Sequence, residues 1–274
     1  MRYHQRRVQI AVIGLGSIGR RHRDNFRALG CDVRTFDILD SLDLEGCQGA
    51  VIATPPESHV ELAWKALGAG CHLMIEKPVS TTLNELGHLF AACDRANRVH
   101  MVAYPWRYDP VLHGKKARIA ELGPILSFGC WYTYDTGNAT ALKMGALLDC
   151  SHAVDLLRWL LGEPATLCAN ISAQGLVADV DIRFAAGGLG RMHVSLTEPL
   201  CCEWTIVGEH GAVDWKRTRD VQDINAMYIA EAAHFLACID YEAVPLTTGW
   251  DAYDTLRVCL AAERSHAEQR WISR

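Results

Sequence analysis

The sequence predicts an α/β domain followed by an α+β domain whose sheet is antiparallel. From Val8 to about Tyr104, short β-branched runs alternate with helical patterns, which is typical of βαβ units and a parallel sheet. A glycine-rich turn separates the first strand of this half from its first helix. From Thr166 to Trp215, several strand patterns follow one another with only short turns between them, which indicates antiparallel pairing.

A chain of 274 residues is long enough for two modest domains, which we place at residues 1–104 and 105–274. Half of the residues are apolar and 22% are charged, which is typical of a globular protein. The formal net charge of -5 is small for this length and the basic residues are scattered. We therefore expect a small-molecule partner rather than nucleic acid or a membrane surface.

Neither the amino-terminal residues nor the cysteines indicate export. The first ten residues, MRYHQRRVQI, are basic but lead directly into a strand pattern, and no apolar run is long enough to cross a bilayer. The eleven cysteines are spread singly from Cys31 to Cys259, apart from the adjacent Cys201 and Cys202, and form no Cys-x-x-Cys pair. We expect a cytoplasmic protein with reduced thiols in its core and no metal site.

The first half contains five predicted strands and three predicted helices. The strands are VQIAVIG (8–14), DVRTFD (32–37), GAVIAT (49–54), HLMIEK (72–77) and RVHMVAY (98–104). The helices run from Ser17 to Leu29, from Glu57 to Ala69 and from Thr82 to Ala96.

In the second half, a helical stretch after Pro110 ends at Gly123-Pro124, and ILSFGCWYTY (125–134) then predicts a long strand. LVADVDIRF (176–184) alternates apolar and charged residues, so one face of this strand is apolar and the other polar. An amphipathic helix over 147–161 is expected to cover the apolar face. Further strands are predicted at 190–196 and 202–208, and helices at 225–241 and 250–268.

The glycine-rich turn has the spacing of a dinucleotide-binding loop. Gly14-x-Gly16-x-x-Gly19 follows a predicted strand and opens a helix, so the backbone amides around Ser17 and Ile18 would face a pyrophosphate. Gly14 permits the tight turn, Gly16 lets the phosphates approach the backbone, and Gly19 lets the helix pack closely on the strand. These observations predict an α/β Rossmann domain followed by an α+β domain with an antiparallel sheet. The alternative is a glycine turn without a ligand.

Asp37 indicates which dinucleotide binds. It ends the second strand about twenty residues after the loop, where a carboxylate accepts a hydrogen bond from a ribose 2′-hydroxyl and repels a 2′-phosphate. This favours NAD. NADP stays open, because Arg20, Arg21 and Arg34 are near enough in sequence to neutralise a phosphate.

Several short motifs together resemble the Gfo/Idh/MocA family of glucose-fructose oxidoreductases and inositol dehydrogenases. The resemblance is nearly end to end, and its most specific element is Glu76-Lys77-Pro78 after the fourth strand. The other motifs are Ala53-Thr54-Pro55-Pro56, Ser58-His59, LLDCSHAVDLLRWLLGEP (147–164) and DAYDTLRVCLAAERSHAE (251–268). The resemblance implies the full fold class, an α/β Rossmann domain followed by an α+β domain with an open, mostly antiparallel sheet. It also implies an active site between the two, beside the nicotinamide.

The resemblance also implies the catalytic residues Lys77, His152 and Asp149. Lys77 would orient and electrostatically stabilise the reacting oxygen, and His152 would accept its proton. On a helix, Asp149 and Asp155 would share the face of His152. The substrate-binding aspartate of the family more commonly stands four residues before the histidine, whereas here the gap is three. The alternatives are a solvated strand end for Lys77 and a histidine paired with a helical carboxylate for His152.

The implied ligand contacts extend beyond these residues. Those toward the cofactor are Gly14, Gly16, Ser17, Ile18, Gly19, Asp37, Thr54, Pro55, Glu76 and Lys77, and those toward the substrate are Lys77, Tyr104, Arg107, Asp149 and His152. Trp106 and Tyr108, in the same segment as Tyr104 and Arg107, are interpreted equally well as part of a buried aromatic cluster. His59 is interpreted as a helix-start or cofactor-edge residue rather than a catalyst.

The predicted function is an NAD(P)-dependent oxidoreductase that transfers a hydride between nicotinamide and a secondary alcohol or ketone of a sugar, inositol or sugar nucleotide. The alternatives are a glycosidase of the same family that retains its NAD, and a non-catalytic NAD(P)-binding sensor. Many relatives associate through the open sheet, so we expect a homo-oligomer, a dimer or tetramer. Its interface would be the polar face with Asp179, Asp181, Arg183, Arg191 and His193. A solvated face is the alternative.

Overall fold

The computed structural model describes residues 7–37, 40–217 and 224–274. By its contacts the chain divides into two compact units. The first comprises Met1–Tyr108 and Ile224–Tyr253, and the second Asp109–Asp223 and Asp254–Arg274. Each unit is therefore built from two separate stretches of the sequence.

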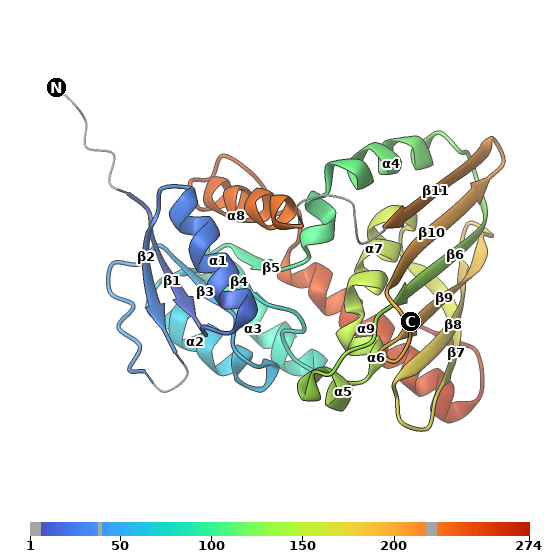
Figure 1. Cartoon of the computed structure of the whole chain (residues 1–274), viewed down its shortest axis with the longest axis horizontal. Coiled ribbons are helices and arrows are strands. Elements are labelled where there is room, and N and C mark those ends of the chain that lie inside the picture. The colour runs from blue at the N-terminus through green and yellow to red at the C-terminus, as the bar shows by residue number, and fades with distance from the viewer. Residues whose placement is uncertain (1–6, 38–39, 218–223) are drawn as a thin grey trace. The chain divides into compact units, whose positions relative to one another are not determined.

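A five-stranded, wholly parallel sheet forms the centre of the first unit (Figure 1). Its strands lie in the order β2-β1-β3-β4-β5. They are β1 (Gln9–Ile13), β2 (Asp32–Phe36), β3 (Gly49–Ile52), β4 (His72–Ile75) and β5 (His100–Val102). Because β1 lies between β2 and β3, the chain crosses over in opposite directions on the two sides of β1. The predicted Rossmann topology is confirmed.

Helices cover both faces of this sheet. Helix α1 (Ser17–Ala28) and helix α8 (Asn225–Ile239) lie over one face, and α2 (His59–Gly68) and α3 (Leu83–Arg95) lie over the other (Figure 1). Short 3₁₀ turns, η1 (Pro56–Ser58) and η2 (Pro105–Tyr108), follow β3 and β5. The apolar side of each helix packs on the strands, which are almost wholly buried except at the β2 edge.

The predicted division at residue 104 assigned the segment of α8 to the second domain, whereas its contacts group it with the first unit. The rings of Phe26 in α1 and Phe235 in α8 meet edge to face, 6.2 Å between centroids. A Cβ on Gly49 of β3 would come within 3.0 Å of both Phe235 and Ile239. The glycine lets α8 lie close against the sheet, a long-range contact that no local pattern reveals.

The second unit contains a seven-stranded sheet in the order β11-β10-β6-β9-β8-β7-β12. Its strands are β6 (Ile125–Thr133), β7 (Pro164–Ile171), β8 (Val177–Phe184), β9 (Leu189–Ser195), β10 (Cys201–Gly208), β11 (Gly211–Arg217) and β12 (Ile272–Ser273). Only the β6–β9 pair is parallel, and the other neighbours are antiparallel. This confirms the predicted open, mostly antiparallel sheet.

The two faces of this sheet differ as the strand pattern predicts. Ala178, Val180 and Ile182 of β8 are buried, whereas Asp179 and Asp181 stay partly exposed on the other face. The helices of the unit are α4 (Pro110–Ala120), α5 (Ala139–Met144), α6 (Ala146–Asp149), α7 (Ser151–Leu161) and α9 (Gly249–Glu268). Helices α6, α7 and α9 lie along the apolar face (Figure 1). The first turn of α9 belongs to the first unit and the rest to the second.

Among the residues that the structure describes, no helix is both long enough and apolar enough to span a bilayer. Within the same residues, no group of three or more His, Cys, Asp or Glu side chains is arranged to hold a metal ion.

Candidate functional site

The predicted cofactor-binding residues, together with the predicted substrate-binding Tyr104, gather at one edge of the parallel sheet. Because all five strands run in the same direction, their carboxyl ends meet at that edge. Each predicted segment directly follows one of these ends. In the order β1 to β5, the residues are Gly14, Asp37, Thr54 with Pro55, Glu76 with Lys77, and Tyr104. This is the edge at which open α/β sheets bind ligands.

The three loop glycines have different structural reasons. Gly14 has φ +94°, and a Cβ there would come within 2.7 Å of the Ala53 backbone. A Cβ on Gly19 would lie 1.9 Å from the Gly14 carbonyl oxygen, so only glycine lets α1 pack so closely on the loop. At Gly16, by contrast, a Cβ would meet no atom of the described residues within 4 Å.

The space at Gly16 fits a phosphate group. Gly16 is the N-cap of α1 and no side chain caps the helix there, so the first amides, around Ser17 and Ile18, face outward from the helix end. The first turn of α1 contains no acidic residue that would repel an anion. A pyrophosphate can therefore approach the backbone at the one loop glycine that protein packing does not require.

Asp37 is exposed just after β2, and its backbone N–H donates to Asp40 Oδ2 at 2.6 Å. The three arginines near the loop all have protein partners. Arg34 pairs with Asp43 and donates to the Glu45 carbonyl, Arg20 donates to the Leu15 carbonyl, and Arg21 lies over the ring of Tyr228. A 2′-phosphate would have to compete with these contacts.

The turn after β3 is tied to the turn after β4 by a buried histidine. Ser58 Oγ lies 2.7 Å from Thr54 Oγ1 and 2.9 Å from the Pro55 carbonyl oxygen, which closes the first turn. His59 begins α2, and its two ring nitrogens lie 2.7 Å from Thr54 O and 2.9 Å from Pro78 O. Its predicted place at a helix start is therefore correct.

Lys77 lies in the turn after β4, preceded by a glutamate that turns inward. Glu76 Oε1 lies 2.8 Å from His22 Nε2, and Glu76 Oε2 accepts the Lys77 backbone N–H at 3.3 Å. The Lys77–Pro78 peptide is cis. Glu76 was predicted to bind the cofactor, and that role stays a prediction, since both carboxylate oxygens here contact the protein.

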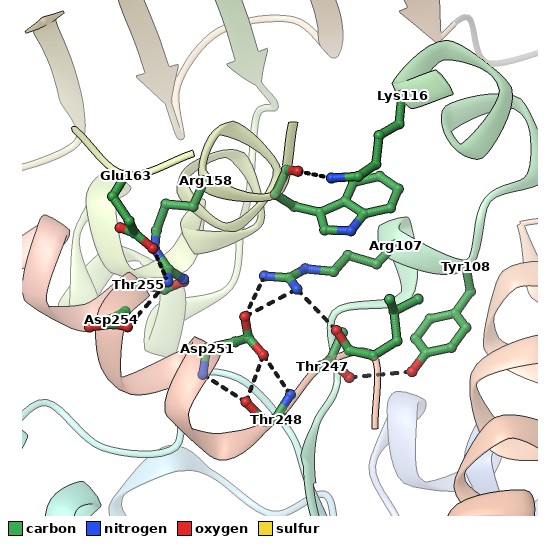
Figure 2. Close-up of polar contacts among 12 residues, drawn as sticks. Arg107, Tyr108, Lys116, Arg158, Glu163, Thr247, Thr248, Asp251, Asp254 and Thr255 are labelled. Atoms are coloured by element: carbon green, nitrogen blue, oxygen red, sulfur yellow. Dashed lines mark hydrogen bonds and ion pairs between the residues drawn. The ribbon is translucent and has the colours of Figure 1, made fainter. Parts of the chain in front are cut away.

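Tyr104 and Arg107 are buried, and Arg107 is held by protein groups. Its guanidinium donates to the Leu246 carbonyl at 3.0 Å and contacts Asp251 Oδ1 at 3.2 Å through both terminal nitrogens (Figure 2). Asp251 Oδ2 in turn accepts from the backbone and hydroxyl of Thr248. The substrate role of Arg107 stays a prediction, and its contacts hold the 246–251 segment in the first unit.

Trp106 and Tyr108 are buried in the same 3₁₀ turn. The Tyr108 hydroxyl lies 3.4 Å from Thr247 Oγ1 (Figure 2). The Tyr108 ring also contacts the His234 ring, with 5.5 Å between centroids. Burial raises the pKa of Tyr108, so this hydroxyl stays protonated. These contacts fit the aromatic-cluster interpretation of this segment.

In the second unit, the segment that carries Asp149 and His152 is two helices rather than one. The predicted helix over 147–161 is wrong in this respect, because Cys150 has ψ 21° and divides α6 from α7. All four residues of α6 are buried, and it packs on β8 and β9. Because α6 is buried on all sides, its packing rather than one amphipathic face determines where the helix runs. Asp149 therefore ends α6 while His152 lies in α7, and the buried Asp155 lies on the same helix as His152.

Tyr132 is a candidate that the sequence interpretation missed. It comes from β6, and its ring centroid lies 6.4 Å from that of His152 and 6.2 Å from that of Tyr134. Strand alternation places Tyr132 on the same face as the buried Phe128 and Cys130. Helices cover that face. The alternation of buried residues along β6 is therefore the sequence signal that could have identified Tyr132.

The helix of His152 is anchored at its other end. Arg158 of α7 forms a bidentate pair with Glu163, 2.6 Å and 3.1 Å, and donates to Thr255 of α9 at 2.8 Å (Figure 2). Lys116 of α4 donates to the Trp159 carbonyl and lies over its indole ring. These contacts fix α7 to two other helices of the second unit.

Comparison with known proteins agrees with this architecture. Residues 27–104 match the family model described as an oxidoreductase family with an NAD-binding Rossmann fold, and residues 115–214 match the GFO/IDH/MocA C-terminal domain. Together the two matches span more than half of the chain.

Individual relatives match over nearly the whole chain. The scyllo-inositol 2-dehydrogenase (NAD(+)) of Bacillus subtilis is 26% identical, over 95% of this chain and 94% of the relative. A levoglucosan dehydrogenase solved with NADH and levoglucosan has a TM-score of 0.87 at 21% identity, over 97% of this chain and 99% of that one. The WlbA dehydrogenase of Bordetella pertussis, solved with NADH and UDP-GlcNAcA, has a TM-score of 0.87 at 20% identity, covering 98% and 99%. On the two family matches, this chain belongs to the Gfo/Idh/MocA family of NAD-binding oxidoreductases.

Proposed function

We propose that this protein is an NAD-dependent dehydrogenase that acts on a secondary alcohol of a cyclic polyol or sugar, or on the corresponding ketone. The observation that carries the proposal is the grouping at the carboxyl edge of the parallel sheet. An open glycine loop, an acid after β2 and a lysine after β4 lie along one edge. The substrate class is supported by the relatives, which are named for scyllo-inositol and levoglucosan.

NAD is proposed over NADP on the surroundings of Asp37. An exposed carboxylate after β2 accepts a hydrogen bond from a ribose 2′-hydroxyl and repels a 2′-phosphate. The nearby Arg20, Arg21 and Arg34 are already engaged by protein groups.

The side chains of the protein would divide the chemistry between them. Bound NAD⁺ supplies the acceptor for the hydride that leaves the alcohol carbon. The ammonium of Lys77 would donate to the substrate oxygen and stabilise the negative charge that develops on it. His152 would take the hydroxyl proton, because an imidazole titrates near neutral pH. Asp149 would bind a neighbouring hydroxyl, and Tyr132 would line the pocket beside His152.

A first experiment tests ligand and reaction together. Thermal unfolding is followed with NAD or NADP, and absorbance at the reduced-nicotinamide band is then recorded with scyllo-inositol, myo-inositol or levoglucosan. We expect stabilisation by NAD over NADP and NADH formation with at least one polyol. Cleavage of a glycoside without net NADH would contradict the dehydrogenase and favour a glycosidase. NAD binding without turnover of any sugar or polyol would favour a sensor.

A second experiment tests the roles of Lys77 and His152. Lys77→Ala and His152→Ala should each lower kcat by about 100-fold or more, with the Kd for NADH within about threefold of the parent. Lys65→Ala is the control, because Lys65 is an exposed lysine of the same unit that pairs with Glu61 on α2. Unchanged turnover in either variant would remove that residue from the mechanism.

We also propose that the protein forms a dimer or tetramer through the outer face of the seven-stranded sheet. Trp131 is 45% exposed there, with Glu203 and His193 beside it in register. The charges on this face are largely paired within the chain, as Arg191 is with Asp181. Burial of the face in an interface would therefore leave few charges unpaired. Trp131→Glu should shift the mass measured by light scattering to that of the monomer, and a monomeric parent would contradict the proposal.

We also propose a cytoplasmic location, because the cysteines are spread singly along the sequence.

A further inference from the structure

The turn that carries Lys77 is contacted from both sides by buried histidines of other elements. His22 lies in α1, and His59 is the first residue of α2. Both side chains are almost wholly buried, with residue exposures of 0% and 1%. Neither residue has a place in the chemistry proposed above, and their burial rules out a solvated surface role.

His22 reaches the turn through Glu76. Its Nε2 lies 2.8 Å from Glu76 Oε1, and a carboxylate oxygen only accepts, so Nε2 carries the proton. The other nitrogen, Nδ1, is buried without a hydrogen-bond partner among the described residues. The ring of Tyr228 packs edge to face with the His22 ring, with 6.1 Å between the centroids, and fixes the plane of the imidazole. Through Glu76 Oε2 the contact continues to the Lys77 backbone N–H at 3.3 Å.

His59 reaches the turn from the other side. Its Nδ1 lies 2.9 Å from the carbonyl oxygen of Pro78, the residue after Lys77, and its Nε2 lies 2.7 Å from the carbonyl oxygen of Thr54. A neutral imidazole donates to one of these carbonyls at a time, and only the imidazolium donates to both. Burial lowers the pKa of His59, and the two carbonyls with the carboxylates of Glu76 and Glu57 oppose that shift without cancelling it.

We propose that His22 and His59 are positioning residues, which hold the Lys77 backbone in a fixed place relative to the two nucleotide-binding turns. His22 belongs to the helix that the glycine loop opens, and His59 is bonded to Thr54 in the turn after β3. The lysine is thereby fastened to the elements that would bind the dinucleotide. The inference rests on the proposed catalytic role of Lys77, and neither histidine touches the reacting atoms.

Substitutions that keep one nitrogen at a time separate the two contacts. His22→Gln keeps a donor near the position of Nε2, whereas His22→Leu removes it. His59→Asn keeps a donor near Nδ1, beside the Pro78 carbonyl, whereas His59→Gln places its donor near Nε2, beside the Thr54 carbonyl. His72 provides the matched control, because it is a buried histidine of the same sheet at the opposite end of β4, where its Nδ1 accepts the Val99 N–H.

Kinetics on scyllo-inositol, myo-inositol or levoglucosan give the first readout. His22→Leu and His59→Gln should lower kcat by about tenfold or more, with the Kd for NADH within about threefold, because a small displacement of a catalytic group is costly. His22→Gln and His59→Asn should recover most of the loss, and His72→Gln should stay within about twofold of the parent. An unchanged kcat in folded His22→Leu and His59→Gln, or an equal loss of NADH affinity, would overturn the inference.

Amide hydrogen exchange of the full chain gives a second readout that needs no substrate. His22→Leu and His59→Gln should speed exchange in the 76–80 segment while β1 stays protected, and His72→Gln should not. Unchanged exchange at 76–80 in both variants overturns the positioning role even if the protein turns over none of the polyols. If both variants exchange faster at 76–80 than the parent but the parent turns over none of the polyols, the failure lies in the proposed function.

Discussion

Both terminal nitrogens of Arg107 contact one oxygen of Asp251, at 3.2 Å each, and the second oxygen of Asp251 holds Thr248 (Figure 2). The Arg107 side chain is 5% exposed and that of Asp251 is 26% exposed. Arg107→Met should lower the free energy of unfolding by about 2–3 kcal/mol, less than for a fully buried pair because water still reaches Asp251. Denaturant unfolding measures this change.

Arg191→Met provides the control for Arg107, because the Arg191–Asp181 pair is exposed and should contribute less than about 1 kcal/mol. A substrate role for Arg107 predicts a different result. If Arg107→Met raised KM for the polyol and left unfolding unchanged, Arg107 would be a binding residue rather than an anchor.

The loop glycines should separate stability from nucleotide binding. Gly16→Ala meets no atom of the described residues within 4 Å, so its unfolding should match that of the parent while NADH binds at least about tenfold more weakly. Gly19→Ala would place its Cβ 1.9 Å from Gly14 O and should lose about 2 kcal/mol or more of folding stability. Differential scanning fluorimetry and NADH fluorescence titration measure the two effects. Normal NADH affinity in Gly16→Ala would exclude a pyrophosphate at the loop.

Asp37 should determine the choice of cofactor. Asp37→Ser removes the acceptor for the ribose 2′-hydroxyl and the charge that repels a 2′-phosphate, so NAD affinity should fall and NADP affinity should rise. Asp32→Ser, at the other end of β2, is the control and should change neither. Isothermal titration with both cofactors measures the ratio. A parent that already preferred NADP would show that the role assigned to Asp37 is wrong.

His193 should make the second unit sensitive to pH. Burial lowers its pKa, but hydrogen bonds from its ring to Asp179 and Glu198, both at 3.0 Å, outweigh burial and raise the pKa above its ordinary 6.5. Because the folded state binds this proton more tightly, the stabilisation is complete below pH 6.5 and is lost as the pH rises through the folded pKa.

Proton NMR titration of the His193 ring and thermal unfolding across about pH 5.5–8.5 test this dependence. Asp179→Asn should lower the His193 pKa and flatten the dependence of unfolding on pH. His88→Gln, at an exposed histidine of α3, should change neither. A titration midpoint below 6.5 in the parent would contradict the prediction.

Local patterns predicted much of this protein because they report backbone preference and burial. The glycine spacing predicted the loop, β-branched runs predicted the parallel strands, and alternation predicted both faces of β8. Resemblance to a family added Lys77, Asp149 and His152, whose roles stay predictions. The division of the helix at Cys150 and the place of Tyr132 beside His152 were missed, because both depend on packing against strands distant in sequence.

The sequence by itself determined the class of each half and the candidate residues of the nucleotide site, because 3.6-residue and two-residue periodicities are local properties. Only the tertiary structure decided that α8 packs with the first unit, that Arg107 is held by Asp251, and that two histidines flank the turn of Lys77. Each of these is a contact between residues far apart along the chain, and such contacts form only when burial of the apolar faces has brought the elements together.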